Sequence, residues 1–158
     1  MSNALTVETL PGQPLIDTVR EFDAPAAAVY AAHADPDVYS RWIGPSTYET
    51  RVTEWDHRSG GAYRFVQKDD DNAEYAFRGA IHTARPGEMI IQTFEWDGAR
   101  DQVSLDIMRF EDLPGGRSRI VGRSVFPSLE NMQDMIDQGM TAGMEEGYRR
   151  LDVLLAAA

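Results

Sequence analysis

Cysteine is absent from the 158-residue chain, which excludes disulfide scaffolds, thiolate metal sites and cysteine nucleophiles. Basic residues are few, because 15 lysines and arginines stand against 26 aspartates and glutamates, for a formal net charge of −11. Nucleic acids and anionic membrane surfaces both attract basic patches, so this balance argues against either partner. No apolar run approaches the roughly 18 residues of a membrane span, and no signal peptide is recognisable. We therefore expect a cytoplasmic protein without membrane insertion.

Motifs for metal binding and catalysis are also missing. His33, His57 and His82 lie on different expected elements and lack the spacing of metal ligands, so we expect no metal and no cofactor. No Gly-x-Ser-x-Gly nucleophile elbow is present. The acidic run 69–74 lacks the glycine and the further ligands of a calcium loop, and we interpret it as a solvated hairpin. These absences favour a protein without catalytic residues, while a histidine acting as acid or base in a cavity stays open.

The residues that are present predict one globular domain over 1–158, since 42% of them are hydrophobic. Residues 1–14 contain prolines and a glycine without periodicity and are interpreted as a loose leader. A first strand is predicted over 15–22, and Pro25 then suits the first turn of a short helix ending at Ala34. Asp35 is a plausible N-cap for a second short helix that reaches Trp42.

The middle of the chain predicts about six strands joined by turns. Their predicted ranges are 48–55, 62–67, 74–84, 88–96, 102–110 and 117–126. Polar, glycine-rich or proline-containing stretches separate these ranges, as expected of hairpins in an antiparallel meander. In the range 102–110 the apolar residues that alternate are Val103, Leu105 and Ile107.

One long helix is predicted from Ser128 to about Leu155, and three glycines interrupt it. Gly139, Gly143 and Gly147 are spaced by four residues and would share one face of that helix. Each glycine costs roughly 1 kcal/mol relative to alanine in a helix interior. The row therefore indicates either close packing, which we favour slightly, or volume left for a ligand. A neighbouring row on the helix contains Ile136, Met140, Met144 and Tyr148.

The order of these elements predicts an α+β fold in which a strongly bent antiparallel sheet surrounds the long C-terminal helix. Three stretches resemble the START-like (SRPBCC, helix-grip) superfamily, and within it the homologues of the activator of the heat-shock-protein-90 ATPase. They are Phe22-Asp-Ala-Pro25 through Trp42-Ile-Gly-Pro45, the turn Asp56-His-Arg-Ser-Gly-Gly61, and Ser124-Val-Phe-Pro-Ser128 with the glycine row. The resemblance implies a curved sheet that grips the last helix, with two short helices after the first strand and a cavity between sheet and helix.

The expected function is the binding of a hydrophobic small molecule, such as a lipid, sterol or polyketide-like compound, in that cavity. Aromatic and methionine side chains suit adaptable cavity walls, although core packing explains any one of them equally well. The candidate ligand-binding residues are Trp42, Tyr63, Phe65, Tyr75, Phe77, Phe94, Trp96, Met108, Met140, Met144 and Tyr148. Gln92 and Arg78 are candidate polar anchors.

Two alternatives remain open at the level of sequence. The resemblance implies a co-chaperone-like module that acts on a heat-shock-protein-90-type ATPase, with the chaperone as partner. An enzyme of the cyclase or hydrolase type would need an ionisable residue in the cavity, for which His82, Arg78 and Glu95 are candidates. The sequence is also compatible with a homodimer.

Overall fold

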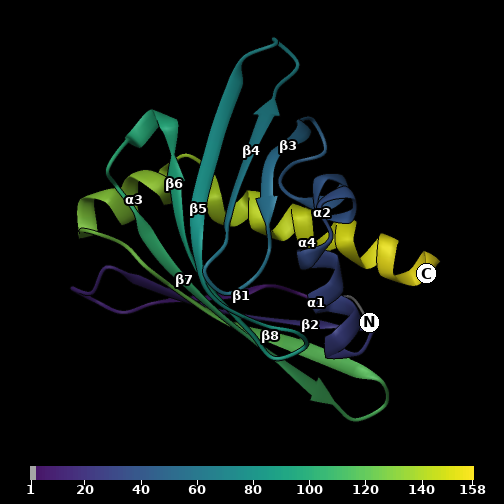
Figure 1. Ribbon diagram of the computed structural model, residues 1–158. Coiled ribbons are helices and arrows are strands. Elements are labelled where there is room, and N and C mark those ends of the chain that lie inside the picture. Colours follow the sequence, from purple (N-terminus) through teal and green to yellow (C-terminus); the bar gives the residue numbers. More distant parts are fainter. Residues whose placement is uncertain (1–2) are drawn as a thin grey trace.

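The computed structural model describes residues 3–158 and shows an eight-stranded antiparallel sheet in the order β1-β2-β8-β7-β6-β5-β4-β3 (Figure 1). The strands are β1 (Thr6–Thr9), β2 (Leu15–Phe22), β3 (Glu49–Asp56), β4 (Ala62–Lys68), β5 (Glu74–Arg85), β6 (Met89–Trp96), β7 (Ser104–Leu113) and β8 (Arg117–Val125). The strands β3 to β8 form a meander, and β2 pairs with β8, so the first and last predicted strands are neighbours.

Four helices and a short 3-10 turn complete the fold. The helices are α1 (Ala26–Ala34), α2 (Pro36–Trp42), α3 (Leu129–Asp137) and α4 (Met140–Ala157), and the turn η1 is Asp97–Ala99. Asp35 caps α2, because its carboxylate accepts hydrogen bonds from the backbone N–H groups of Asp37 at 2.9 Å and Val38 at 3.4 Å. Ser128 caps α3 in the same way, accepting from the N–H of Asn131 at 3.0 Å.

The structure corrects two predicted elements. Residues 1–14 are not wholly irregular, since Thr6–Thr9 pairs with β2 as an edge strand. The predicted long helix is two helices, because Gly139 adopts φ of +90° between α3 and α4. This left-handed conformation suits glycine and ends the regular hydrogen bonding of α3, so only Gly143 and Gly147 lie within α4.

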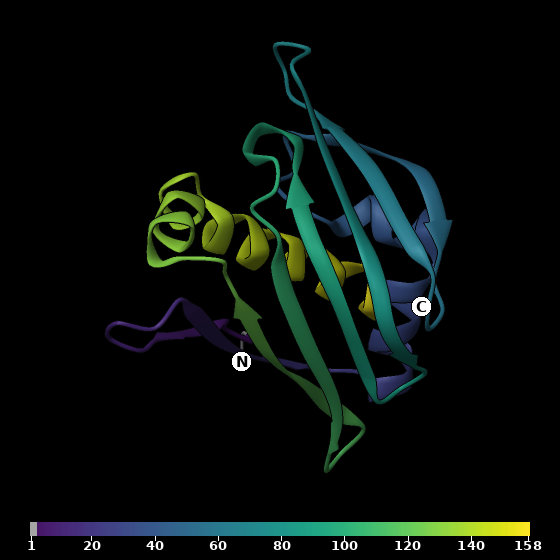
Figure 2. The same ribbon diagram turned by 60° about the vertical axis from the view of Figure 1, so that its left-hand side comes forward.

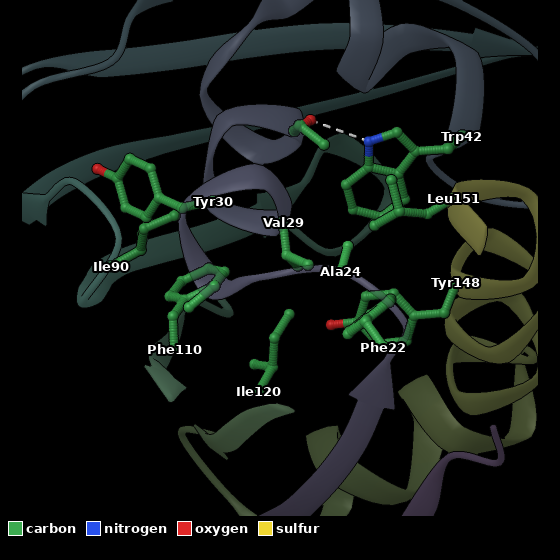
Figure 3. Packing of buried hydrophobic residues seen from close by; sticks show 12 residues of the cluster. Phe22, Ala24, Val29, Tyr30, Trp42, Ile90, Phe110, Ile120, Tyr148 and Leu151 are labelled. Carbon is green, nitrogen blue, oxygen red and sulfur yellow. Dashed lines mark hydrogen bonds between the residues drawn. The ribbon is translucent and has the colours of Figure 1, made fainter. Parts of the chain in front are cut away.

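Helix α4 lies across the concave face of the sheet, and α1 and α2 cover one end of it (Figures 1 and 2). The main core forms where these helices meet the sheet. Figure 3 shows Tyr148 and Leu151 of α4 pointing toward Phe22 and Trp42. Tyr148 contacts Phe22 edge-on at 5.4 Å between ring centroids and stacks on Trp42 at 5.9 Å. This end of the molecule is therefore solidly packed.

The alternating apolar residues of 102–110 lie on the convex face of the sheet and not on its inner face. Val103 and Leu105 are 42% and 38% exposed, because they lie on the convex side. The inner face of β7 carries Ser104, Asp106, Met108 and Phe110. It continues to Ile120 of β8, which pairs with Phe110. The alternation Val103, Leu105, Ile107 thus belongs to the outer surface, and polar residues line part of the interior.

The observed architecture confirms the predicted α+β helix-grip fold, with a curved antiparallel sheet around a C-terminal helix. Over residues 3–158, no helix combines the length and apolarity that crossing a membrane requires.

Candidate functional site

Aromatic rings form a continuous ladder across β4, β5 and β6 on the inner face. Phe65 stacks on Phe77 with ring centroids 5.1 Å apart, and Phe77 stacks on Phe94 at 5.3 Å. Phe77 is paired in register with Trp96, which is two residues from Phe94, so all of these rings share one face. Phe65 is buried, whereas Phe77, Phe94 and Trp96 are only partly buried although they face inward.

Helix α2 covers one end of this ladder, because Tyr39 contacts Phe65 edge-on at 5.6 Å between ring centroids. The hydrophobic cluster built on the buried Tyr63, Phe65 and Ile81 gathers side chains from the sheet, α2 and the segment after α2. Within the described range 3–158, it includes none from α3 or α4. The other end of the ladder, at Phe77 and Phe94, is therefore apolar inner-face surface that is only partly buried.

Other predicted ligand-binding residues lie in packed surroundings. Trp42 is 3% exposed, and its indole Nε1 donates a hydrogen bond to the Ala32 carbonyl at 3.0 Å. Tyr63 is equally buried and donates from its hydroxyl to the Thr93 carbonyl at 2.6 Å. Tyr148 belongs to the main core. The structure thus places Tyr63 and Phe65 at the β4 end of the ladder, and it places Trp42 and Tyr148 outside the ladder.

The remaining predicted residues surround the ladder. Tyr75 stacks on Tyr48 at 5.8 Å and approaches Trp96 at 6.5 Å, at the end of the sheet. Met108 and Met144 pack at the edge of the main core. Met140 instead joins a second small cluster with α3 and the start of β2. All four side chains are partly buried.

A cleft of about 370 Å³ opens where the sheet meets α3. Trp96, Gly98 and Gln102 line its sheet side, and Asn131, Asp134 and Met135 are among the residues on the α3 side. Trp96 belongs both to the cleft and to the aromatic face, so the cleft adjoins the end of the ladder. Its volume falls within the range of small-molecule sites, about 300–1,000 Å³.

A second, much smaller hollow of about 10 Å³ lies deeper, between the sheet and α1–α2. Its lining includes His33, His57, Gln92 and Met108. This volume is close to the minimum for one water molecule, about 10–15 Å³. His33 is buried, its Nδ1 lies 2.8 Å from the Val29 carbonyl, and burial lowers its pKa to about 4. Burial also lowers the pKa of His57, so both rings are neutral at neutral pH.

Three polar side chains cross the centre of the inner face in one row. Gln92 of β6 pairs with Asp106 of β7, and Asp106 pairs with Ser124 of β8. The row continues into apolar residues on both sides, with Ile81 opposite Gln92 and Ile16 opposite Ser124. A purely structural sheet would place apolar residues at such central positions, so this interruption marks a candidate binding site.

Asp106 is the ionisable member of this row. The hydroxyl of Ser124 donates a hydrogen bond to its Oδ1 at 2.8 Å. Burial raises the pKa of the Asp106 carboxyl from 3.8 to about 6, and the Ser124 hydrogen bond offsets part of that effect. Burial raises the pKa values of Tyr39, Tyr63 and Tyr148, and the field of Asp106 raises each of them further. Tyr39 and Tyr63 line the small hollow together with Gln92, the strand partner of Asp106.

The other interior charges are already paired. Arg20 of β2 is 1% exposed and forms a bidentate contact with Asp152 of α4, at 2.9 Å and 2.6 Å. Its guanidinium also lies 4.8 Å from the ring centroid of Phe22. This ion pair ties the sheet to α4, so Arg20 is held in place and is not offered to Asp106.

None of the three candidates for catalysis is on the concave face, although Glu95 is buried, with 7% of its surface exposed. Arg78 and Glu95 form an ion pair at 2.7 Å on the convex face, next to the inward-facing Phe77 and Phe94. The N–H of Asp101 also donates to Glu95 at 2.7 Å, and these two contacts lower the pKa of Glu95. His82 is exposed and bonds to the neighbouring Thr83 hydroxyl. Arg78 is thus directed away from the interior, whereas Gln92 lies on the inner face and lines the small hollow.

Sequence reasoning missed Asp106, Ser124 and the acidic residues of α3. The only usable signal for Asp106 was that it alternates with Val103, Leu105 and Ile107 and therefore points to the opposite face of the strand. Across residues 3–158, no group of three or more His, Asp or Glu side chains is arranged to hold a metal ion. The candidate site therefore consists of the aromatic ladder, the polar row and the adjoining cleft.

Comparison with known proteins agrees with this architecture. Residues 23–156 match the family described as Activator of Hsp90 ATPase homolog 1-like protein. A search of curated protein sequences finds no match for the chain. Among solved structures, a protein from Rhodobacter sphaeroides superimposes with a TM-score of 0.88 at 21% identity, covering 98% of this chain and 99% of that one. A protein from Mycobacterium smegmatis gives 0.86 at 23% identity, covering 97% of each chain.

A structure labelled AHSA1, from Silicibacter pomeroyi, is also similar, with a TM-score of 0.73 at 20% identity over 90% of this chain and 98% of that one. At these identities the structural likeness establishes the fold.

Proposed function

The chain belongs to the Activator of Hsp90 ATPase homolog 1-like family, and on that premise we propose that it binds a small, mainly apolar molecule between its sheet and helices α3 and α4. The aromatic ladder carries the proposal, because Phe77 and Phe94 face inward but are only partly buried, and among residues 3–158 their cluster includes no side chain of α3 or α4. Trp96 is also partly buried and lines the cleft, with Tyr75 beside it. Met108 and Met144 lie at the edge of the main core, and Met140 lies in the cluster with α3.

In this proposal the cleft is the entrance to the space, because Trp96 belongs both to the cleft and to the aromatic face. Ligand pockets are typically apolar with a few polar groups that orient the ligand, and the ladder with Gln92, Asp106 and Ser124 fits that description. Burying aromatic area contributes about 25 cal/mol per Å² of apolar surface, so a ligand stacked along the ladder gains most of its affinity there.

Tryptophan fluorescence tests the proposal directly. Trp42 and Trp55 both donate hydrogen bonds to carbonyls of α1, whereas Trp96 lines the cleft. We expect a fatty alcohol, a sterol or naphthol to change the emission of Trp96 and to raise the melting temperature. A Trp96→Phe variant should keep the thermal shift and lose the fluorescence response.

Phe94→Ala and Leu105→Ala provide a matched pair of variants. Phe94 belongs to the ladder, whereas Leu105 is on the convex face of the same sheet and is 38% exposed. We expect Phe94→Ala to weaken binding about tenfold or more, while Leu105→Ala leaves it unchanged. Equal affinities for both folded variants, or no binding by the intact chain, would refute the proposed site.

A second candidate function is action on a heat-shock-protein-90-type ATPase, which the description of the matched family favours. The decisive measurement is the ATPase rate of the cognate chaperone at saturating concentrations of this protein. An increase in rate would support a co-chaperone role, and an unchanged rate would exclude it.

A further inference from the structure

Resting on the proposed function, we infer that the ligand is an organic cation, an amine with an apolar or aromatic body, whose charged group binds at Asp106. The position of this carboxylate carries the inference. It lies on the inner face between Gln92 and Ser124, in the middle of a sheet whose buried side chains are mostly apolar.

One oxygen of Asp106 is free to accept a ligand. Oδ1 accepts the Ser124 hydroxyl at 2.8 Å, and no residue of the described chain donates to Oδ2. Nor is Oδ2 sealed in, since the side-chain atoms found buried without a partner in residues 3–158 are Arg20 Nε and Ser118 Oγ. Oδ2 therefore keeps some accessible surface, and the Ser124 bond fixes its direction.

No cationic side chain of residues 3–158 neutralises this carboxylate. Asp106 takes part in no ion pair among the described residues, and Arg20, the buried arginine of the inner face, is held by Asp152. Tyr39 and Tyr63 line the small hollow beside Gln92, the strand partner of Asp106, and aromatic rings attract organic cations. An unpaired carboxylate held largely away from bulk water is costly, and an ammonium group would offset that cost.

The cleft proposed as the entrance is acidic, which also favours a cationic ligand. The cleft beside Trp96 is lined by two charged side chains, Glu130 and Asp134, and by no lysine or arginine. The whole chain carries a net charge of −11. Such a field raises the local concentration of cations and repels fatty-acid or other carboxylate ligands.

The spacing sets the length of the ligand. Trp96 and Gln92 lie four residues apart on β6, and Asp106 is the partner of Gln92. Four residues of extended strand span roughly 13 Å. An amine bound at Asp106 would therefore lay an apolar tail of about that length along Phe94 toward Trp96 and the cleft.

Three matched compounds test the inference: phenylbutylamine, phenylbutanol and phenylbutyrate, which are cationic, neutral and anionic. Isothermal titration calorimetry near pH 7.5 should show the amine binding about tenfold or more tightly than the alcohol, with the acid weakest. Asp106→Asn should abolish the preference for the amine and leave the affinity for the alcohol nearly unchanged. Asp70→Asn, which removes the same charge from an exposed hairpin, should keep the preference.

The pH dependence gives an independent readout. Amine affinity of the intact chain should fall about tenfold as the pH drops from about 7.5 to about 5, because Asp106 becomes protonated, whereas the Asn variant should show a flat profile. The other facing groups do not titrate there: the tyrosine hydroxyls and neutral His33 keep their protonation states, and Arg20 stays paired with Asp152. His57 on the neighbouring loop also has its pKa lowered and is unchanged by the Asn substitution.

The outcomes separate this inference from the proposed function. Equal binding of amine and alcohol by the intact chain, or an amine preference that survives Asp106→Asn, would overturn the inference while leaving a ligand-binding interior intact. Binding of none of the three compounds would overturn both.

Discussion

At the scale of single residues, Asp106 sets a pH dependence of stability. Its folded-state pKa of about 6 lies above its ordinary value of 3.8, so ionisation favours the unfolded chain. The destabilisation is absent below about pH 4, grows as the pH rises, and is complete above about pH 6. Asp106→Asn should therefore raise the free energy of unfolding by about 2–3 kcal/mol at pH 8 and by much less near pH 4.5.

Urea unfolding at the two pH values measures this difference. Asp70→Asn is the control, because Asp70 is exposed in the β4–β5 hairpin and its substitution should change stability little at either pH. If Asp106→Asn raised the free energy of unfolding equally at both pH values, burial of the ionised carboxylate would not be what destabilises the folded chain.

The sequence predicts the types of residue in the site better than their placement. Aromatic residues at alternate positions of 62–67, 74–84 and 88–96 do form the ladder, because strand alternation puts them on one face. Asp106 escaped prediction because Val103, Leu105 and Ile107 carry the stronger apolar pattern and lie on the convex side. Which face of a strand is buried depends on the curvature of the whole sheet. The periodicity of a single strand therefore does not reveal which face that is.

At the scale of elements, the Arg20–Asp152 pair connects β2 to α4. Asp152→Ala should lower the free energy of unfolding by about 2–4 kcal/mol, since it leaves a 1%-exposed guanidinium without its partner. Arg20→Met, which removes the buried charge itself and keeps an apolar side chain beside Phe22, should cost less. A double-mutant cycle on thermal unfolding checks the ranking, and a larger loss for Arg20→Met would show that the pair is not the main contribution.

The glycine row gives three different environments. A methyl group on Gly147 would lie 3.0 Å from the Trp42 carbonyl and 3.2 Å from the Gly44 nitrogen, so α4 approaches the segment after α2 closely there. On Gly143 it would meet only Pro45, at 3.7 Å, which is ordinary contact. Gly139 is the break between α3 and α4, with positive φ.

Alanine substitutions should therefore act in opposite directions. Gly143→Ala should stabilise the protein by about 0.5–1 kcal/mol through helix propensity. Gly147→Ala should destabilise it by about 1–3 kcal/mol, since backbone atoms would have to move. Thermal unfolding of the two variants distinguishes them. A stabilising Gly147→Ala would show that the contact with the Trp42–Gly44 segment is loose.

The same glycines explain why the sequence predicts one helix where two form. Because the three glycines are spaced by four residues, the helical pattern does not show which of them ends a helix. The hydrophobic period also continues from Met132 to Tyr148 across the break. The chain turns at Gly139 because α3 packs its Met132 against Ile16 and Phe126, away from the main core that α4 enters through Tyr148. Which of the two clusters each helix joins is decided by tertiary packing, and the local sequence does not indicate it.

At the scale of the whole molecule, the order of elements was sufficient to predict the helix-grip fold, because a meander followed by an amphipathic helix has few ways to bury both apolar faces. The edges of the sheet were less predictable. Strand β1 covers the edge of β2 with only Thr6–Thr9, all exposed, so its four residues show no burial pattern from which to infer a strand.

This edge provides the last prediction. Thr6 and Glu8 pair with Val19 and Asp17, and they cover backbone groups of β2 that would otherwise be open to another chain. Removal of residues 1–11 should leave the core folded, since β2 retains β8 as its other neighbour, but should promote association through the bared β2 edge. Light scattering coupled to size-exclusion chromatography should then show a larger, concentration-dependent mass than for the full chain, with an unchanged circular dichroism spectrum. Val19→Lys, introduced into the truncated chain on the exposed side of β2, should reverse the association by charge repulsion, and an unchanged mass on truncation would show that β1 does not protect this edge.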